Sequence, residues 1–208
     1  MILSRAEIPW TAARDPYQHH RVLWRLFPDE PREPRQGEAQ PRQGFLFRVE
    51  DNRPGRPARM LVQSRRHPIP AAGVTLIATR EIQPQPCAGQ RLAFLLTANP
   101  VKTIKDAQAE QKPGKARNTC RVPLIKEVEQ RAWLARKLEN AAAIEAVTLL
   151  PHQPLFFRRG GSPGKLSTLS FEGVLCVQDP KLLVTLLENG IGPAKAFGCG
   201  LLLVRRLG

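Results

Sequence analysis

The chain has few features of a membrane-spanning or disulfide-stabilised protein. No apolar run reaches the length of about 18 residues that a transmembrane helix needs, and no basic amphipathic helix stands out. The N-terminal segment is too short and too charged for a signal peptide. The four cysteines (Cys87, Cys120, Cys176 and Cys199) form no C-x-x-C pair, so no zinc spacing is present. We therefore expect reduced, half-buried thiols, no metal, no cofactor, no small-molecule substrate and a cytoplasmic protein.

Acidic residues are also scarce. Asp and Glu number 18 against 32 Lys and Arg, which gives a formal net charge of +14 and a pI near 10.6. A basic surplus of this size indicates a polyanionic partner, because clustered cations release counterions from phosphates. The alternative is that the charge only keeps the surface soluble. With 208 residues, 42% of them hydrophobic, the chain has room for one large or two small packed domains.

One helix is predicted near the N-terminus, from Asp15 to Phe27. Asp15 is a good N-cap, Pro16 suits the first helical position, and Pro28 ends the pattern. At about 100° per residue, one side of this helix faces the core. Its core-facing residues are Val22, Leu23, Leu26 and Phe27.

The flank of this helix carries candidate catalytic groups. Tyr17, His20 and Trp24 have i, i+3, i+7 spacing, so their side chains can converge. Imidazole ordinarily titrates near pH 6.5, at about the pH where an acid–base catalyst works best, and a tyrosine beside it can assist proton transfer. The alternative is that His20 is a packed helix residue and Tyr17 lies at the edge of the core. The helix alone leaves both interpretations open.

The remaining pattern is mostly strand. Strands are expected at 2–9, 45–50, 59–64, 74–82, 91–98, 144–150 and 201–206, a hairpin at 155–175, and helices at 124–143 and 181–189. The helix at 124–143 has an apolar stripe formed by Ile125, Val128, Ala132, Ala135 and Leu138. Residues 29–44, rich in Pro, Arg, Gln and Glu, predict a loop. From 91 onward the order is that of the ferredoxin-like plan, which RNA-recognition domains share, and the first half is an incomplete version of it.

Three further segments are candidates for contact with phosphates. An exposed basic loop is expected at 99–121, and its cations are Lys102, Lys105, Lys112, Lys115, Arg117 and Arg121. The tip of the 155–175 hairpin carries Arg158, Arg159 and Lys165, and the alternative there is a solvated turn. The glycine-rich segment 190–200 contains Lys195 and follows a helix, the wrong order for dinucleotide binding. It is either a turn that packs the two halves together or an RNA contact.

Several of these segments together resemble one known family. They are YQHHRVLWRLFP (17–28), FLFRVE (45–50), ANPVKTIK (98–105), CRVPLIKE (120–127), FEGVL (171–175) and GIGPAKAFGCGLL (190–202). In combination and in this order they are similar to the CasE family, the CRISPR repeat-processing endoribonucleases of type I-E systems. The resemblance covers nearly the whole chain, and residues 29–44 depart from it most.

The resemblance implies an α+β fold of two tandem ferredoxin-like (RRM-like) domains with antiparallel sheets. We place the first, with the catalytic helix, at 1–90 and the second, with the basic hairpin and glycine-rich loop, at 91–208. It also implies metal-independent cleavage of a CRISPR repeat at the base of its stem-loop, retention of the cut RNA, and membership of the Cascade complex with its other subunits. The family's catalytic tyrosine and histidine match Tyr17 and His20, and its basic hairpin matches Arg158, Arg159 and Lys165.

Two hypotheses follow from the sequence. In the first, the protein is a site-specific endoribonuclease in which His20 serves as base or acid and a lysine or arginine stabilises the transition state. In the second, it is a non-catalytic RNA-binding subunit of an RNA–protein complex, and His20 is merely packed. The two differ at Tyr17 and His20.

Overall fold

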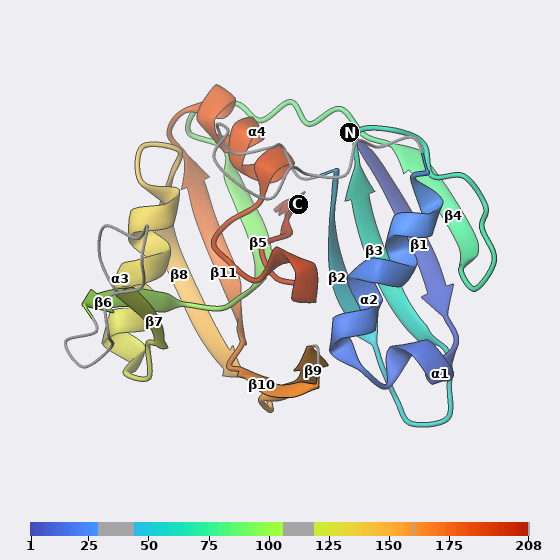
Figure 1. The fold of residues 1–208 in the computed structure, drawn as a ribbon. Coiled ribbons are helices and arrows are strands. Elements are labelled where there is room, and N and C mark those ends of the chain that lie inside the picture. The colour runs from blue at the N-terminus through green and yellow to red at the C-terminus, as the bar shows by residue number, and fades with distance from the viewer. Residues whose placement is uncertain (29–43, 106–118, 160, 208) are drawn as a thin grey trace.

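The computed structural model describes residues 1–28, 44–105, 119–159 and 161–207, which form two four-stranded antiparallel sheets (Figure 1). The predicted loop at 29–44 falls almost entirely outside these residues, as do Lys112, Lys115 and Arg117. Over the described ranges, no helix is long and apolar enough to cross a membrane.

The first sheet is built from the N-terminal strands. Its elements, in chain order, are β1 (Ile2–Ile8), α1 (Trp10–Ala13), α2 (Pro16–Leu23), η1 (Trp24–Leu26), β2 (Phe45–Asp51), β3 (Ala58–Ser64) and β4 (Thr75–Glu81). The strand order across the sheet is β2-β3-β1-β4, and the pairings are antiparallel.

The second sheet follows the same plan. Its elements are β5 (Arg91–Ala98), α3 (Glu127–Leu138), β8 (Ala142–Pro151), β11 (Leu169–Val177), α4 (Pro180–Asn189), η2 (Lys195–Phe197) and β12 (Leu202–Arg206). The strand order is β12-β5-β11-β8. In each sheet the two central strands are the first and the third of that sheet in chain order. The fourth strand lies beside the first and the second lies beside the third, which is the ferredoxin-like order. The predicted α+β fold with two ferredoxin-like antiparallel sheets is confirmed.

Helix α2 packs on one face of the first sheet. The Asp15 side chain accepts a hydrogen bond from the Tyr17 amide at 3.0 Å, so it is the N-cap that the sequence predicts. The α-helix ends at Leu23, earlier than predicted, and continues as the single 3₁₀ turn η1. The predicted core side is confirmed, because Val22, Leu23, Leu26 and Phe27 are buried in the same cluster as Phe45, Phe47 and Met60.

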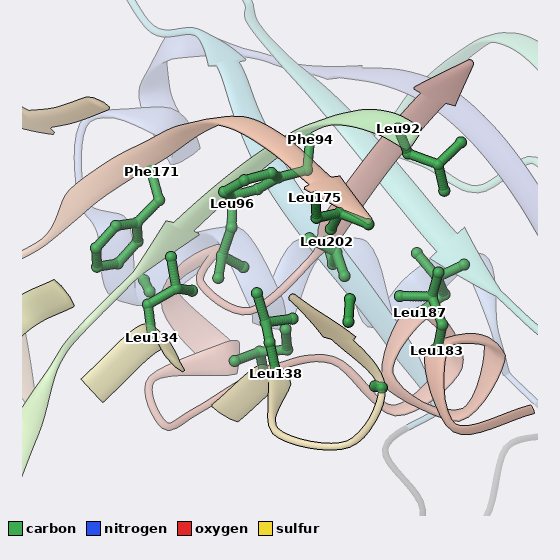
Figure 2. Packing of buried hydrophobic residues seen from close by; sticks show 14 of the residues in the cluster. Leu92, Phe94, Leu96, Leu134, Leu138, Phe171, Leu175, Leu183, Leu187 and Leu202 are labelled. Atoms are coloured by element: carbon green, nitrogen blue, oxygen red, sulfur yellow. The ribbon is translucent and has the colours of Figure 1, made fainter. Parts of the chain in front are cut away.

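Figure 2 shows the core of the second sheet, where leucines and phenylalanines of the strands meet α3 and α4. The predicted apolar stripe of α3 is largely wrong. Ile125 and Val128 are 76% and 79% exposed, and Ala132 and Ala135 are also exposed. The helix begins only at Glu127, and its rotation is set by Trp133, which stacks on Phe171 with ring centroids 6.2 Å apart. The buried residues of α3 are therefore Trp133, Leu134 and Leu138.

Two two-stranded ribbons extend from the second sheet. The ends of the predicted basic loop pair as β6 (Val101–Lys105) and β7 (Thr119–Pro123), because β-branched residues there favour strand. The predicted long hairpin is instead a short one, β9 (Leu155–Arg159) with β10 (Ser162–Leu166). The rest of that run is β11, whose buried Leu169, Phe171 and Leu175 place it in the centre of the sheet.

The two sheet units pack against each other. The side chain of Gln63 in β3 donates a buried 2.7 Å hydrogen bond to the Leu187 carbonyl in α4, and Arg65 pairs with Glu188 at 3.3 Å. Gly190, at the end of α4, has φ +71°, and a Cβ there would lie 2.8 Å from a methyl carbon of Leu46 in β2. The glycine-rich segment thus has the domain-packing role that was one of its two predicted roles.

The cysteines differ from one another more than expected. Cys120 and Cys176 are partly buried as predicted, but Cys87 is exposed and Cys199 is buried. Burial raises the pKa of the Cys199 thiol to about 12. All four are free thiols.

Candidate active site

His20 lies in an aromatic cage formed by α2, η1 and β2. Its ring centroid is 5.1 Å from that of Phe45, 5.7 Å from that of Trp24 and 6.3 Å from that of Phe47. Burial among these rings lowers the pKa of His20 from 6.5 to about 4. The imidazole is therefore neutral at neutral pH. Its Nε2 is buried and has no hydrogen-bond partner among the described residues.

Tyr17 faces the second sheet unit. Its ring is stacked on Phe157 of β9, with centroids 6.3 Å apart and planes inclined by 14°, and lies 6.4 Å from the ring of Phe197 in η2. Tyr17 thus projects from α2 toward the junction of the two units. The ring contacts of His20 are instead with residues of the first unit, Trp24, Phe45 and Phe47. In Figure 1 this junction lies where the lower end of α2 approaches β9 and the loop that carries η2.

His19, the neighbour of His20, is fully packed. It is 3% exposed, and its Nε2 donates a 2.8 Å hydrogen bond to the carbonyl of Ala13 in α1. Burial lowers the pKa of His19. These contacts are those of a residue that holds α2 against α1.

The β9–β10 hairpin presents its charged side to solvent. Arg158 and Lys165 are exposed, and the Lys165 ammonium lies 5.8 Å from the ring centroid of Phe156, which is itself 68% exposed. Strand alternation turns Phe157 the other way, toward Tyr17. The hairpin therefore contacts α2 through Phe157 and carries its exposed cations and the Phe156 ring on its other face.

The other predicted RNA-binding cations among the described residues are divided between the β6–β7 ribbon, away from α2, and the two segments β9 and η2 that contact α2. Lys102 and Arg121 are exposed on the β6–β7 ribbon, on the far side of the second sheet unit from α2 (Figure 1). Lys102 is also ion-paired with Glu129 of α3 at 3.2 Å. The backbone of Lys105 and of Arg159 lies in β6 and β9. The ammonium of Lys195 donates to the carbonyl of Asn189, the last residue of α4, at 2.7 Å.

The site contains aromatic residues that the sequence analysis did not assign. Phe45 and Phe47 enclose His20, and Phe157 and Phe197 contact Tyr17. Phenylalanines in a strand pattern are ordinary core residues, so composition offered no signal for them. Two of these residues come from the second sheet unit, more than 130 positions along the chain from Tyr17. A contact between residues so far apart in the sequence leaves no local pattern from which it could be predicted.

The structure consists of two four-stranded sheets of ferredoxin-like order, with a basic hairpin beside a histidine-bearing helix. This arrangement defines the class of tandem ferredoxin-like proteins. The family model described as "CRISPR associated protein" matches residues 1–206. The chain is 44% identical over 202 residues to the CRISPR system Cascade subunit CasE of Escherichia coli K12, covering 97% of this chain and 98% of that one. The protein therefore belongs to this family of CRISPR-associated proteins.

A second relative and two solved structures are also similar to this chain over nearly its full length. The CRISPR-associated endoribonuclease Cse3 of Thermus thermophilus is 32% identical over 207 residues, which cover 91% of this chain and 90% of Cse3. The crystal structure of E. coli Cas6e superposes with a TM-score of 0.82 at 43% identity, over 100% of both chains. T. thermophilus Cse3 bound to an RNA representing a pre-cleavage complex gives a TM-score of 0.72 at 30% identity, over 98% of both chains.

Proposed function

We propose that the protein is a metal-independent endoribonuclease that cleaves CRISPR precursor RNA within each repeat, at the base of the stem-loop. The observation that carries this proposal is that Tyr17 lies against the basic hairpin at one end of α2, while His20 lies one helical turn further along with its Nε2 unbonded among the described residues. Because Nε2 of His20 makes no hydrogen bond to the protein among the described residues, it is available to accept a proton from a substrate. The name of the T. thermophilus relative, an endoribonuclease, and its RNA-bound structure support the same function.

The proposed reaction is an internal transesterification. The ribose 2′-hydroxyl attacks the adjacent phosphorus, the bond from phosphorus to the 5′-oxygen breaks, and a 2′,3′-cyclic phosphate and a 5′-hydroxyl result. A base must take the 2′ proton, an acid must supply a proton to the 5′-oxygen, and cations must offset the charge that develops on the phosphorane.

The aromatic cage around His20 supports this residue as the base. Because the surrounding rings keep the imidazole of His20 uncharged at neutral pH, the free protein offers a proton acceptor and not a donor. In this scheme His20 takes the 2′ proton, and the hydroxyl of Tyr17 donates to the 5′-oxygen. Arg158 and Lys165, exposed on the adjacent hairpin, hold the phosphates and stabilise the added charge. A substrate held in line for attack would contribute much of the rate.

The proposal also covers the partners of the protein and its cellular compartment. We infer that the protein binds the repeat stem-loop before and after cleavage and assembles with the other subunits of Cascade, as the name of the E. coli relative states for that protein. Four free thiols and an RNA partner support the cytoplasm as its compartment. We also propose domain bounds of 1–90 and 91–208, supported by the placement of β1–β4 in one sheet and of β5, β8, β11 and β12 in the other.

A repeat-RNA cleavage assay tests the proposal. Wild-type protein in EDTA is expected to cut the RNA once per repeat, and His20→Ala is expected to bind it with similar affinity but leave it whole. A single 2′-deoxy substitution at the cleaved nucleotide should also block the reaction. Cutting by His20→Ala would remove the assignment of His20, and cutting of the 2′-deoxy RNA would remove the mechanism. Binding without any cutting by the wild type would favour the non-catalytic RNA-binding subunit.

A further inference from the structure

Two phenyl rings from the second sheet unit hold the Tyr17 ring. Phe157 of β9 is nearly parallel to it, with planes inclined by 14° and centroids 6.3 Å apart, and Phe197 of η2 lies 6.4 Å away. The two phenyl rings also contact each other, with centroids 4.5 Å apart. We call Tyr17, Phe157 and Phe197 the aromatic clamp. It joins the first helix to two segments that lie far along the chain.

Gly164 makes room for the ring of Phe157. It pairs directly with Phe157 in the β9–β10 register. A Cβ at this position would lie 2.3 Å from Cζ and 2.5 Å from Cε2 of Phe157, well inside van der Waals contact. The glycine is thus required by the space that the Phe157 ring occupies. Any larger residue would push the ring off the hairpin and change its contact with Tyr17.

The hairpin has two faces with different contacts. Phe156 is 68% exposed and lies opposite Lys165, and Arg158 is exposed on the same strand. Phe157, between Phe156 and Arg158, points inward against α2. The element that carries the proposed phosphate contacts is therefore the element that touches the proposed catalytic tyrosine.

We propose that Phe157 is a positioning residue for catalysis, which acts by holding the Tyr17 ring, and that Gly164 is the residue that lets it do so. This inference rests on the catalytic role proposed for Tyr17. A phenol on a short helix can pivot about its side-chain torsions, and stacking on a ring fixed in a hairpin restricts it to one orientation. A hydroxyl displaced by about 1 Å can cost on the order of 100-fold in rate.

Kinetics of the single and double variants test the coupling. Phe157→Leu keeps an apolar side chain but loses the stack, and it is expected to lower the single-turnover cleavage rate by about 10- to 100-fold, with RNA affinity within about threefold of wild type. Phe157→Tyr keeps the stacking ring and should cut at close to the wild-type rate. In a Tyr17→Phe background, where the hydroxyl is already absent, Phe157→Leu should cost less than about threefold more.

The Tyr17 ring can be followed directly, because it is the only tyrosine in the chain. Protein labelled with 3-fluorotyrosine therefore gives a single ¹⁹F resonance. Phe157→Leu and Gly164→Ala should both shift this resonance, because both remove the Phe157 ring from its stacked position. Phe156→Leu is the matched control, since that neighbouring ring is exposed on the other face of the hairpin, and the resonance should stay in place. Thermal melts of each variant establish that it is folded.

The outcomes separate this inference from the proposed function. Losses from Tyr17→Phe and Phe157→Leu that multiply in the double variant would overturn positioning and leave the role of Tyr17 intact. A Tyr17→Phe variant that cuts at the wild-type rate would overturn the role of Tyr17 and the inference with it. A loss of RNA affinity in Phe157→Leu that matches its loss of rate would assign the residue to binding. A Gly164→Ala resonance identical to wild type would overturn the role of Gly164.

Discussion

The imidazole of His20 lies against the phenyl ring of Phe45, with centroids 5.1 Å apart and planes inclined by 36°. Phe45 is 2% exposed and is also stacked on Phe27, so it cannot easily move aside. A charged imidazolium in this position would lose most of its hydration, which is why the pKa of His20 falls to about 4. The contact therefore favours the neutral form of His20 in the free protein.

The first prediction concerns the pH dependence of cleavage. If His20 is the base, it must be unprotonated in the free protein, and kcat/KM should hold level as pH falls from 6.5 and decline only near pH 4. The measurement is the cleavage rate at limiting RNA concentration across that range. A rate that declines around pH 6.5 would show a solvated imidazole, and one that rises on acidification would assign His20 as the acid.

The second prediction concerns stability. Between pH 6.5 and pH 4 the unfolded chain carries a proton on His20 and the folded protein does not, so the free energy of unfolding should fall as pH is lowered through this window. Full stability is kept above pH 6.5, and the loss attributable to this residue is at most about 3 kcal/mol. Urea unfolding of wild type and His20→Leu at both ends of the window measures it. An equal pH slope in both proteins would refute the depressed pKa.

The third prediction separates the two adjacent histidines. His19 is buried and bonded to the Ala13 carbonyl, so His19→Ala should cost about 1 to 3 kcal/mol of stability through the lost bond and the lost packing, although Asn52 still donates to the same carbonyl at 3.3 Å. His19→Gln, whose amide can reach the same carbonyl, should recover part of it. Below its melting temperature each variant should cut RNA within a few-fold of wild type. An inactive but fully folded His19→Gln would show that the wrong histidine has been assigned.

The sequence predicted α2 and its flank because the signals there are local. Asp15, Pro16 and the apolar periodicity lie within a few turns of helix, and the Tyr17–His20 spacing follows from helix geometry alone. The order of strands in the second half was enough to predict its topology. What escaped prediction depends on contacts distant in sequence. Trp133 rotates α3 onto Phe171, and Phe157 reaches Tyr17 from another sheet unit, and no local pattern encodes either pairing.

The fourth prediction tests whether the β9–β10 hairpin contacts phosphates. RNA affinity should fall steeply with salt, and Arg158→Ala should weaken binding and reduce the slope of log K against log salt by about 1. Arg80→Ala is the control, because Arg80 is an exposed arginine on β4, at the edge of the first sheet opposite β2. Its slope should equal that of wild type. Equal slopes for all three proteins would place the RNA away from the hairpin.

The last prediction concerns the packing of the two sheet units at Gly190. This residue has φ +71° and ψ +165°, a conformation that side chains rarely adopt, and a Cβ would lie 2.8 Å from Leu46 and 2.9 Å from the Gly200 carbonyl oxygen. Gly190→Ala should therefore destabilise the protein by roughly 3 kcal/mol or more. Gly89→Ala is the control, since Gly89 has φ +77° but nothing within 4 Å of a Cβ.

Strain alone should cost Gly89→Ala about 1 to 2 kcal/mol, so the larger loss expected in Gly190→Ala reports its rarer ψ together with the contacts of its Cβ with Leu46 and with the Gly200 carbonyl. Because the Gly190 segment leads into η2 and Phe197, Gly190→Ala should also shift the ¹⁹F resonance of Tyr17, and Gly89→Ala should not. Equal destabilisation by both substitutions, with the resonance unmoved in each, would mean that the packing of β2 against this segment has no part in forming the site.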